Sequence, residues 1–131
     1  MKAAPLQRAV FALISYVVDS LKSTSNLLGT MIEKYDEEYF LRGKESGKSL
    51  YENYRWLPEL TKPMSERIAD HLGIELTDKI LDFGCSRGYM VKALTELGYD
   101  ASGIDISEWA INNCDEAVKG MVAQGSIPVL N

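Results

Sequence analysis

Apolar and polar residues alternate in blocks along the second half of the chain, and these blocks predict strands and helices in turn. The run KILDF, residues 79–83, is short and apolar, as expected of a buried strand. In residues 88–98, Met90, Leu94 and Leu97 recur three or four positions apart. This spacing puts them on one face of a helix, so a strand followed by a helix is predicted here.

The alternation continues toward the end of the chain. Residues 99–106 predict a second strand, residues 107–120 a second helix with Ser107 as its N-cap, and a third strand begins at Met121. Strands and helices in this order form βαβ units with parallel strands and right-handed crossovers. The second half of the chain therefore predicts an α/β fold.

The first half is less regular. Residues 6–21 are apolar around most of a helical circumference, so we expect a helix that other parts of the protein cover. The apolar run is too short to span a bilayer and is interrupted by Asp19, which argues against a membrane segment or a signal peptide. Short helical pieces are expected at 31–40 and 50–56, on either side of a flexible loop at 43–47.

A further helix is predicted at 61–73, where Pro63 suits the first turn and Gly73 the end. The chain then divides into an N-terminal helical segment, residues 1–60, and a sheet domain, residues 61–131. The net charge of -5 argues against a nucleic-acid-binding surface. The two cysteines and one histidine form no metal-binding spacing, so no metal site is predicted and reduced thiols in the cytoplasm are expected.

Small residues connect the first strand to the helix that follows it. Gly84 allows a sharp bend, Gly88 allows close packing, and Cys85 and Ser86 leave the space above the turn open. The spacing is G-x-S-x-G, whereas dinucleotide-binding turns have G-x-G-x-x-G. Asp82, two residues before the turn, would repel the phosphates of a dinucleotide and suit a ligand with a positive amino group, such as S-adenosylmethionine. An NAD(P)-dependent oxidoreductase is therefore disfavoured.

A second carboxylate, Asp105, ends the second strand, beside the end of the first. It can accept two hydrogen bonds from a ribose diol, and Ile106 offers an apolar face to an adenine ring. The alternative for Asp105 alone is a cap at the end of a strand.

The stretch LDFGCSRGYMVKALTELGYDASGIDISEWAINNC resembles the first two motifs of class I S-adenosylmethionine-dependent methyltransferases, over residues 79–117. The resemblance implies that Asp82 holds the methionine amino group, that the turn shapes the methionine pocket, and that Asp105 and Ile106 hold the adenosine. Ser86 departs from the family, where glycine is usual, and Ser126 matches a third motif weakly. The implied cofactor contacts are Asp82, Gly84, Cys85, Ser86, Gly88, Asp105, Ile106 and Ser126.

The resemblance also implies a Rossmann-like parallel sheet with helices on both faces, of which this chain supplies the first half, three strands, preceded by N-terminal helices. The fourth strand, which would pair with residues 79–83, is missing. The first strand would then have an open edge that a second copy of the chain or the N-terminal helix covers.

The function implied is methyl transfer from S-adenosylmethionine, with a small-molecule acceptor and weak or absent activity for this chain alone. No catalytic residue is predicted. The alternative is a non-catalytic half-domain that binds cofactor or assembles with a partner chain. In similar enzymes the segment before the sheet is a lid, so residues 1–60 are lid-like, although their aromatic residues could simply cover the sheet. The residues concerned are Tyr35, Tyr39, Tyr51 and Trp56, with Arg42 and Arg55 as candidate partners of the cofactor carboxylate.

Overall fold

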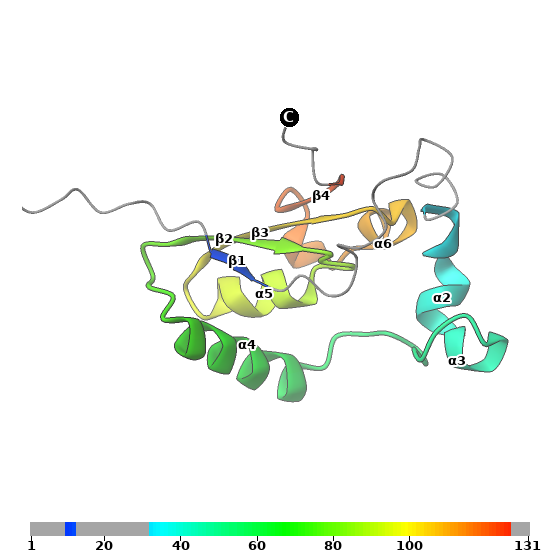
Figure 1. The fold of residues 1–131 in the computed structure, drawn as a ribbon, viewed down its shortest axis with the longest axis horizontal. Helices are drawn as coiled ribbons and strands as arrows, with labels where there is room; N and C mark the ends of the chain where they lie inside the picture. Colours follow the sequence, from blue (N-terminus) through cyan, green and yellow to red (C-terminus); the bar gives the residue numbers. More distant parts are fainter. Residues whose placement is uncertain (1–9, 13–31, 127–131) are drawn as a thin grey trace, which may run out of the picture.

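A computed structural model describes residues 10–12 and 32–126, and they form an α/β structure around a parallel sheet (Figure 1). Within these residues the sheet has four strands in the order β1-β2-β3-β4, and each neighbouring pair is parallel. The three strands expected from the sequence are β2, β3 and β4, so the predicted α/β class is confirmed. The strands are β1 Val10–Ala12, β2 Lys79–Phe83, β3 Asp100–Asp105 and β4 Val122–Gln124.

Two helices lie together along one face of the sheet, α4 (Pro58–Leu72) and α5 (Tyr89–Glu96) (Figure 1). The first begins three residues earlier than predicted, because Pro58 itself occupies the first helical position and suits it. It ends at Gly73, whose φ of 63° is in the left-handed region. Further helices in the described part of the chain are α2 (Glu37–Leu41), α3 (Gly43–Ser46), α6 (Glu108–Asn112) and the short 3-10 helix η1 (Glu116–Val118).

The core lies between the sheet and these helices. Gly103 of β3 lets Cys85 pack directly on the strand backbone, because a Cβ at position 103 would lie 2.6 Å from the Cβ of Cys85. Gly88 has the same function toward η1, where a Cβ would lie 2.6 Å from Cγ2 of Val118. The buried cluster comprises Ala69, Ile74, Ile80, Cys85, Val91, Leu94, Ala101 and Val118.

The predicted helix at 107–120 is wrong in its second half. The helix α6 ends at Asn112, and the chain turns before η1 begins at Glu116. Two bonds from outside the segment hold this turn, since Arg87 Nε donates to the carbonyl of Asn113 at 2.6 Å and the N–H of Asp115 donates to the carbonyl of Arg87 at 3.0 Å. The Asp115 side chain then accepts from the N–H of Ala117 and caps η1.

The prediction at 43–56 is also wrong in two places. The expected flexible loop contains α3, and the expected helix at 50–56 is irregular, non-helical backbone. The backbone groups of this stretch bond across to α2 and α3: Asn53 N–H donates to the carbonyl of Leu41 at 2.9 Å, and Tyr54 N–H donates to that of Phe40 at 3.0 Å. These bonds replace those that a helix would have supplied.

The N-terminal helix expected at 6–21 is wrong at residues 10–12, which form β1. This strand pairs with β2 in the register Val10↔Ile80 to Ala12↔Asp82. The edge of β2 that was expected to be open is therefore paired at these positions by a strand of the same chain. The rest of 6–21 lies outside the described residues. In the part of the chain described here, no helix has the length and apolarity to cross a membrane.

Candidate functional site

The turn after β2 is fastened to the end of β3. The N–H groups of Gly84 and Cys85 both donate to the carbonyl of Ile104, at 2.8 and 3.1 Å. The backbone has positive φ at Gly84 (84°), Ser86 (53°) and Gly88 (80°), so the chain reverses sharply before α5 begins. The glycines at the first and last of these positions have the conformational role predicted from the spacing.

Asp105 receives two backbone hydrogen bonds in this arrangement. Its Oδ2 accepts from the N–H of Ser86 at 2.7 Å, and its Oδ1 accepts from the N–H of Ser107 at 2.8 Å. The carboxylate therefore joins the glycine turn to the start of α6. A carboxylate has about four acceptor positions, so each oxygen keeps one for a further donor.

Asp82 lies on the adjacent strand β2, opposite Gly103 and so two positions before Asp105, and it differs in its surroundings. It is only 7% exposed, and among the described residues no group donates a hydrogen bond to its carboxylate. Burial, and to a lesser degree the charge of Asp105, raises the pKa of Asp82 to about 6. The end of the sheet thus holds two acidic groups, one of which has neither a donor nor a cation beside it in the described residues.

Ser86 contributes a further unpaired polar group at the same place. It is 9% exposed, and its hydroxyl has no hydrogen-bond partner in the described part of the protein. The Ser86 hydroxyl lies close enough to the Tyr54 phenol to favour its ionised form, against the larger effect of burial, although no hydrogen bond joins the two groups. Burial raises the pKa of Tyr54 far above its usual value, so this phenol remains protonated. Buried hydroxyls without partners are uncommon in folded proteins, and here one lies inside the glycine turn.

The aromatic residues of the N-terminal segment gather at this end of the sheet. Phe40 stacks on Trp109 of α6, with ring centres 5.5 Å apart, and Tyr54 packs on Tyr89 at the start of α5, at 5.1 Å. The hydroxyl of Ser107 donates to the carbonyl of Tyr35 at 2.6 Å. The segment is therefore attached to the residues around the two carboxylates.

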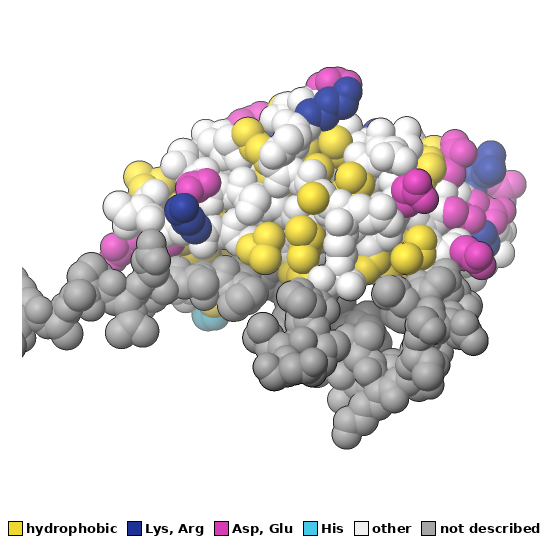
Figure 2. Space-filling model, turned by 90° about the horizontal axis from the view of Figure 1, so that it is seen from above, with side chains coloured by type: hydrophobic (Ala, Val, Ile, Leu, Met, Phe, Trp, Pro, Cys, Tyr) yellow, Lys and Arg dark blue, Asp and Glu magenta, His cyan; other side chains and the backbone are white. Residues whose placement is uncertain are grey.

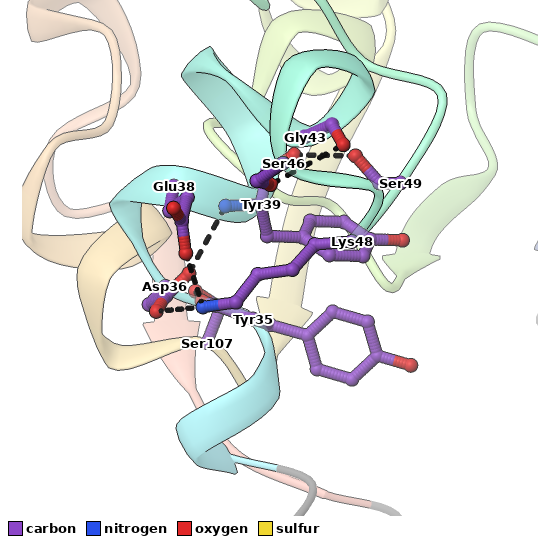
Figure 3. Close-up of polar contacts among 9 residues, drawn as sticks. All are labelled: Tyr35, Asp36, Glu38, Tyr39, Gly43, Ser46, Lys48, Ser49 and Ser107. Atoms are coloured by element: carbon purple, nitrogen blue, oxygen red, sulfur yellow. Dashed lines mark hydrogen bonds and ion pairs between the residues drawn. The ribbon is translucent and has the colours of Figure 1, made fainter.

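Ion pairs join residues within the aromatic N-terminal segment. Lys48 pairs with Asp36 at 2.8 Å and with Glu38 at 2.7 Å, while the rings of Tyr35 and Tyr39 point the other way (Figure 3). Seen from above, acidic and basic side chains gather at the end of the molecule that holds α2 and α3 (Figure 2). The charge of Asp105 contributes to the raised pKa of Tyr39, after burial and the neighbouring tyrosines, so the Tyr39 ring lies within electrostatic reach of the site.

Arg87 contacts the aromatic segment, a role that was not predicted from the sequence. Its Nη1 donates to the carbonyl of Tyr54 at 3.2 Å, and its guanidinium lies 5.6 Å from the ring centres of both Tyr89 and Trp109. It thus joins the aromatic segment to the glycine turn. The arginines that were proposed as carboxylate partners, Arg42 and Arg55, are both exposed. No sequence motif could have distinguished these roles, because the partners of Arg87 are far away along the chain.

The other residues predicted to contact the cofactor differ from one another in burial. Cys85 points into the core, where burial raises its pKa and keeps it a thiol, so its side chain supports the turn from below. Ile106, which follows Asp105, is half-buried. Ser126 is exposed, although Gly125 N–H donates to the backbone carbonyl of Asp105 at 2.9 Å and so keeps this end of β4 close.

Comparisons with known proteins identify no matching family model, no similar curated protein and no similar solved structure. Over residues 10–12 and 32–126, no three His, Cys, Asp or Glu side chains are grouped as a metal-binding set.

Proposed function

We propose that this chain binds S-adenosylmethionine at the carboxyl ends of β2 and β3, as the N-terminal half of a methyltransferase-type domain. The observation that carries the proposal is Asp82, a buried carboxylate to which no group of the described residues donates a hydrogen bond, within electrostatic reach of Asp105. A buried acid of this kind is stabilised by a positive partner. The ammonium group of the methionine end of S-adenosylmethionine is such a partner.

Asp105 supports the nucleoside part of the proposal. Two of its acceptor positions are taken by backbone N–H groups, which fix the orientation of the carboxylate. The remaining positions can accept hydrogen bonds from a ribose diol, and bonds of this kind to an ionised acceptor are short and strong. The same pair of acids would repel the pyrophosphate of a dinucleotide, so an NAD(P) site is disfavoured on electrostatic grounds.

S-adenosylmethionine supplies an activated methyl group. Transfer forms a bond from the acceptor to the methyl carbon, breaks the carbon–sulfur bond, and releases S-adenosylhomocysteine and a proton. Alignment and proximity supply much of the acceleration in such a reaction. We assign no catalytic residue, propose a small-molecule acceptor, and expect this chain alone to have weak activity. The alternative, a binding half-domain that assembles with a partner chain, shares the same site.

Isothermal titration calorimetry with S-adenosylmethionine and S-adenosylhomocysteine tests the site. Wild type should bind both, and Asp82→Asn and Asp105→Asn should each weaken binding about tenfold or more, because each removes a charge-assisted contact. The matched control is Asp100→Asn, an exposed acid at the opposite end of β3, which should change the affinity less than about twofold.

Failure of the wild-type chain to bind either compound, or tighter binding of NAD⁺ than of S-adenosylhomocysteine, would overturn the proposal. Release of S-adenosylhomocysteine in the presence of a panel of small-molecule acceptors then separates an enzyme from a binding module.

A further inference from the structure

Among the described residues, the buried hydroxyl of Ser86 in the glycine turn has no hydrogen-bond partner, and the phenol of Tyr54 in the aromatic segment lies within electrostatic reach of both Ser86 and Asp82. We propose that Ser86 and Tyr54 together form the site for the carboxylate of an α-amino acid group, at the methionine end of the ligand. The inference rests on the proposed function, because Asp82 must first hold the ammonium group of the same ligand.

The Ser86 hydroxyl is buried and has no hydrogen-bond partner in the part of the chain that the structure describes, although the backbone N–H of the same residue donates to Asp105 at 2.7 Å. The residue also has a φ of 53°, a conformation that glycine adopts more readily. The turn therefore carries a side chain that strains it and leaves a polar group without a partner. A ligand atom that accepts from this hydroxyl would satisfy that group.

Backbone hydrogen bonds and ring packing hold Tyr54 in a fixed position. Its N–H donates to the carbonyl of Phe40 at 3.0 Å, and its own carbonyl accepts from Arg87 at 3.2 Å. Its ring packs between those of Tyr51 and Tyr89, at 5.0 and 5.1 Å between centres. Backbone and ring are thus fixed, and the phenol is kept in its protonated form by burial. A fixed, protonated phenol is a hydrogen-bond donor that needs little reorganisation on binding.

An α-amino acid ligand also carries a carboxylate, which requires hydrogen-bond donors of its own. In an α-amino acid, the ammonium and the carboxylate are attached to one carbon, so a carboxylate must lie close to any ammonium held by Asp82. It cannot turn toward Asp105, which is also negative, and it requires donors. The guanidinium of Arg87 is already directed at the carbonyls of Tyr54 and Asn113. Neutral hydroxyl donors therefore take the place that an arginine occupies in many carboxylate sites.

The test compares two ligands that differ at this end. S-adenosylhomocysteine carries the amino-acid group, whereas 5′-methylthioadenosine keeps the adenosine and the sulfur but lacks it. Tyr54→Phe and Ser86→Gly should each weaken binding of S-adenosylhomocysteine about five- to tenfold and leave binding of 5′-methylthioadenosine unchanged. The control is Tyr99→Phe, at the opposite end of β3, which should affect neither ligand.

The serine variant separates binding from folding. Glycine relieves the positive φ at position 86, so Ser86→Gly should unfold at the same or a higher temperature than wild type while binding S-adenosylhomocysteine more weakly. Equal loss for both ligands, or no loss with either variant, would overturn the inference. If wild type binds neither ligand, the proposed function fails instead, so the two failures can be told apart.

Discussion

The ionised carboxylate of Asp82 destabilises the folded chain, and a bound cationic group would relieve this effect. Its pKa is about 6 in the fold, against an ordinary value of 3.8. As the pH rises, the unfolded chain therefore loses this proton first, and the fold loses stability between about pH 4 and pH 6. The cost is complete above this range and is on the order of 3 kcal/mol. Asp82→Asn should therefore raise the free energy of unfolding at pH 8, by up to about that amount.

Urea unfolding at pH 4.5 and pH 8 measures this effect. At pH 4.5 the carboxyl is still protonated in the fold but is already largely ionised in the unfolded chain, so only about 1 kcal/mol of this effect is present and the variant should exceed wild type by about that amount. Asp100→Asn, which removes an exposed charge, should change stability little at either pH. A variant that is less stable than wild type at pH 8 would contradict the prediction, because it would show that the ionised carboxylate of Asp82 has a favourable partner in the fold. The same variant should lose ligand binding, so stability and binding are opposed at this residue.

The residues of the turn show how far spacing alone predicts a site. Gly84 and Gly88 were identified because their conformational freedom is a property of the residue itself, and the structure gives both a positive φ. The orientation of Cys85 was not predictable, because it depends on the absence of a side chain at Gly103, on another strand. The unpaired hydroxyl of Ser86 likewise depends on what surrounds it. The surroundings of such side chains are determined by tertiary packing, which the spacing of a motif does not reveal.

At the scale of elements, the helix α4, which packs on α5, contains a buried polar residue. Ser65 has no exposed surface, and its hydroxyl has no partner among the described residues. Ser65→Ala removes this unpaired group and replaces serine with a better helix former. We expect stabilisation of about 1 kcal/mol and a rise in Tm of a few degrees, measured by differential scanning calorimetry. Glu66→Ala, on the exposed side of the same helix, controls for helix propensity alone, and a lower Tm for Ser65→Ala would contradict the prediction.

The elements that the sequence predicted well are those with internal periodicity. The bounds of β2 agree with the predicted 79–83, and α5 lies within the predicted 88–98, because each has apolar residues at the spacing of its own structure. The break after α6 was missed, since Arg87 fixes it from outside the segment. The irregular backbone at 50–56 was missed for the same reason, because its backbone groups bond to α2 and α3.

At the scale of the whole molecule, the sequence predicted three neighbouring parallel strands and left one edge of β2 unpaired. The structure pairs that edge with β1, from a segment that was expected to be helical. A short apolar run does not distinguish a buried helix from a buried strand, so this assignment needed the neighbouring strand as well as the run itself. The pairing also gives the N-terminal segment a role, because an unpaired parallel edge invites association with another chain.

Removing this pairing should change the oligomeric state. Replacing Val10, Phe11 and Ala12 with prolines eliminates every backbone donor of β1, whereas replacing the same residues with threonines keeps the donors and a good strand propensity. The proline variant should expose the edge of β2 at Ile80–Asp82 and self-associate increasingly with concentration, as followed by sedimentation velocity. The threonine variant should sediment like wild type. If the proline variant sediments and unfolds like wild type at every concentration, β1 does not protect this edge, and another part of the molecule must prevent the strand from pairing.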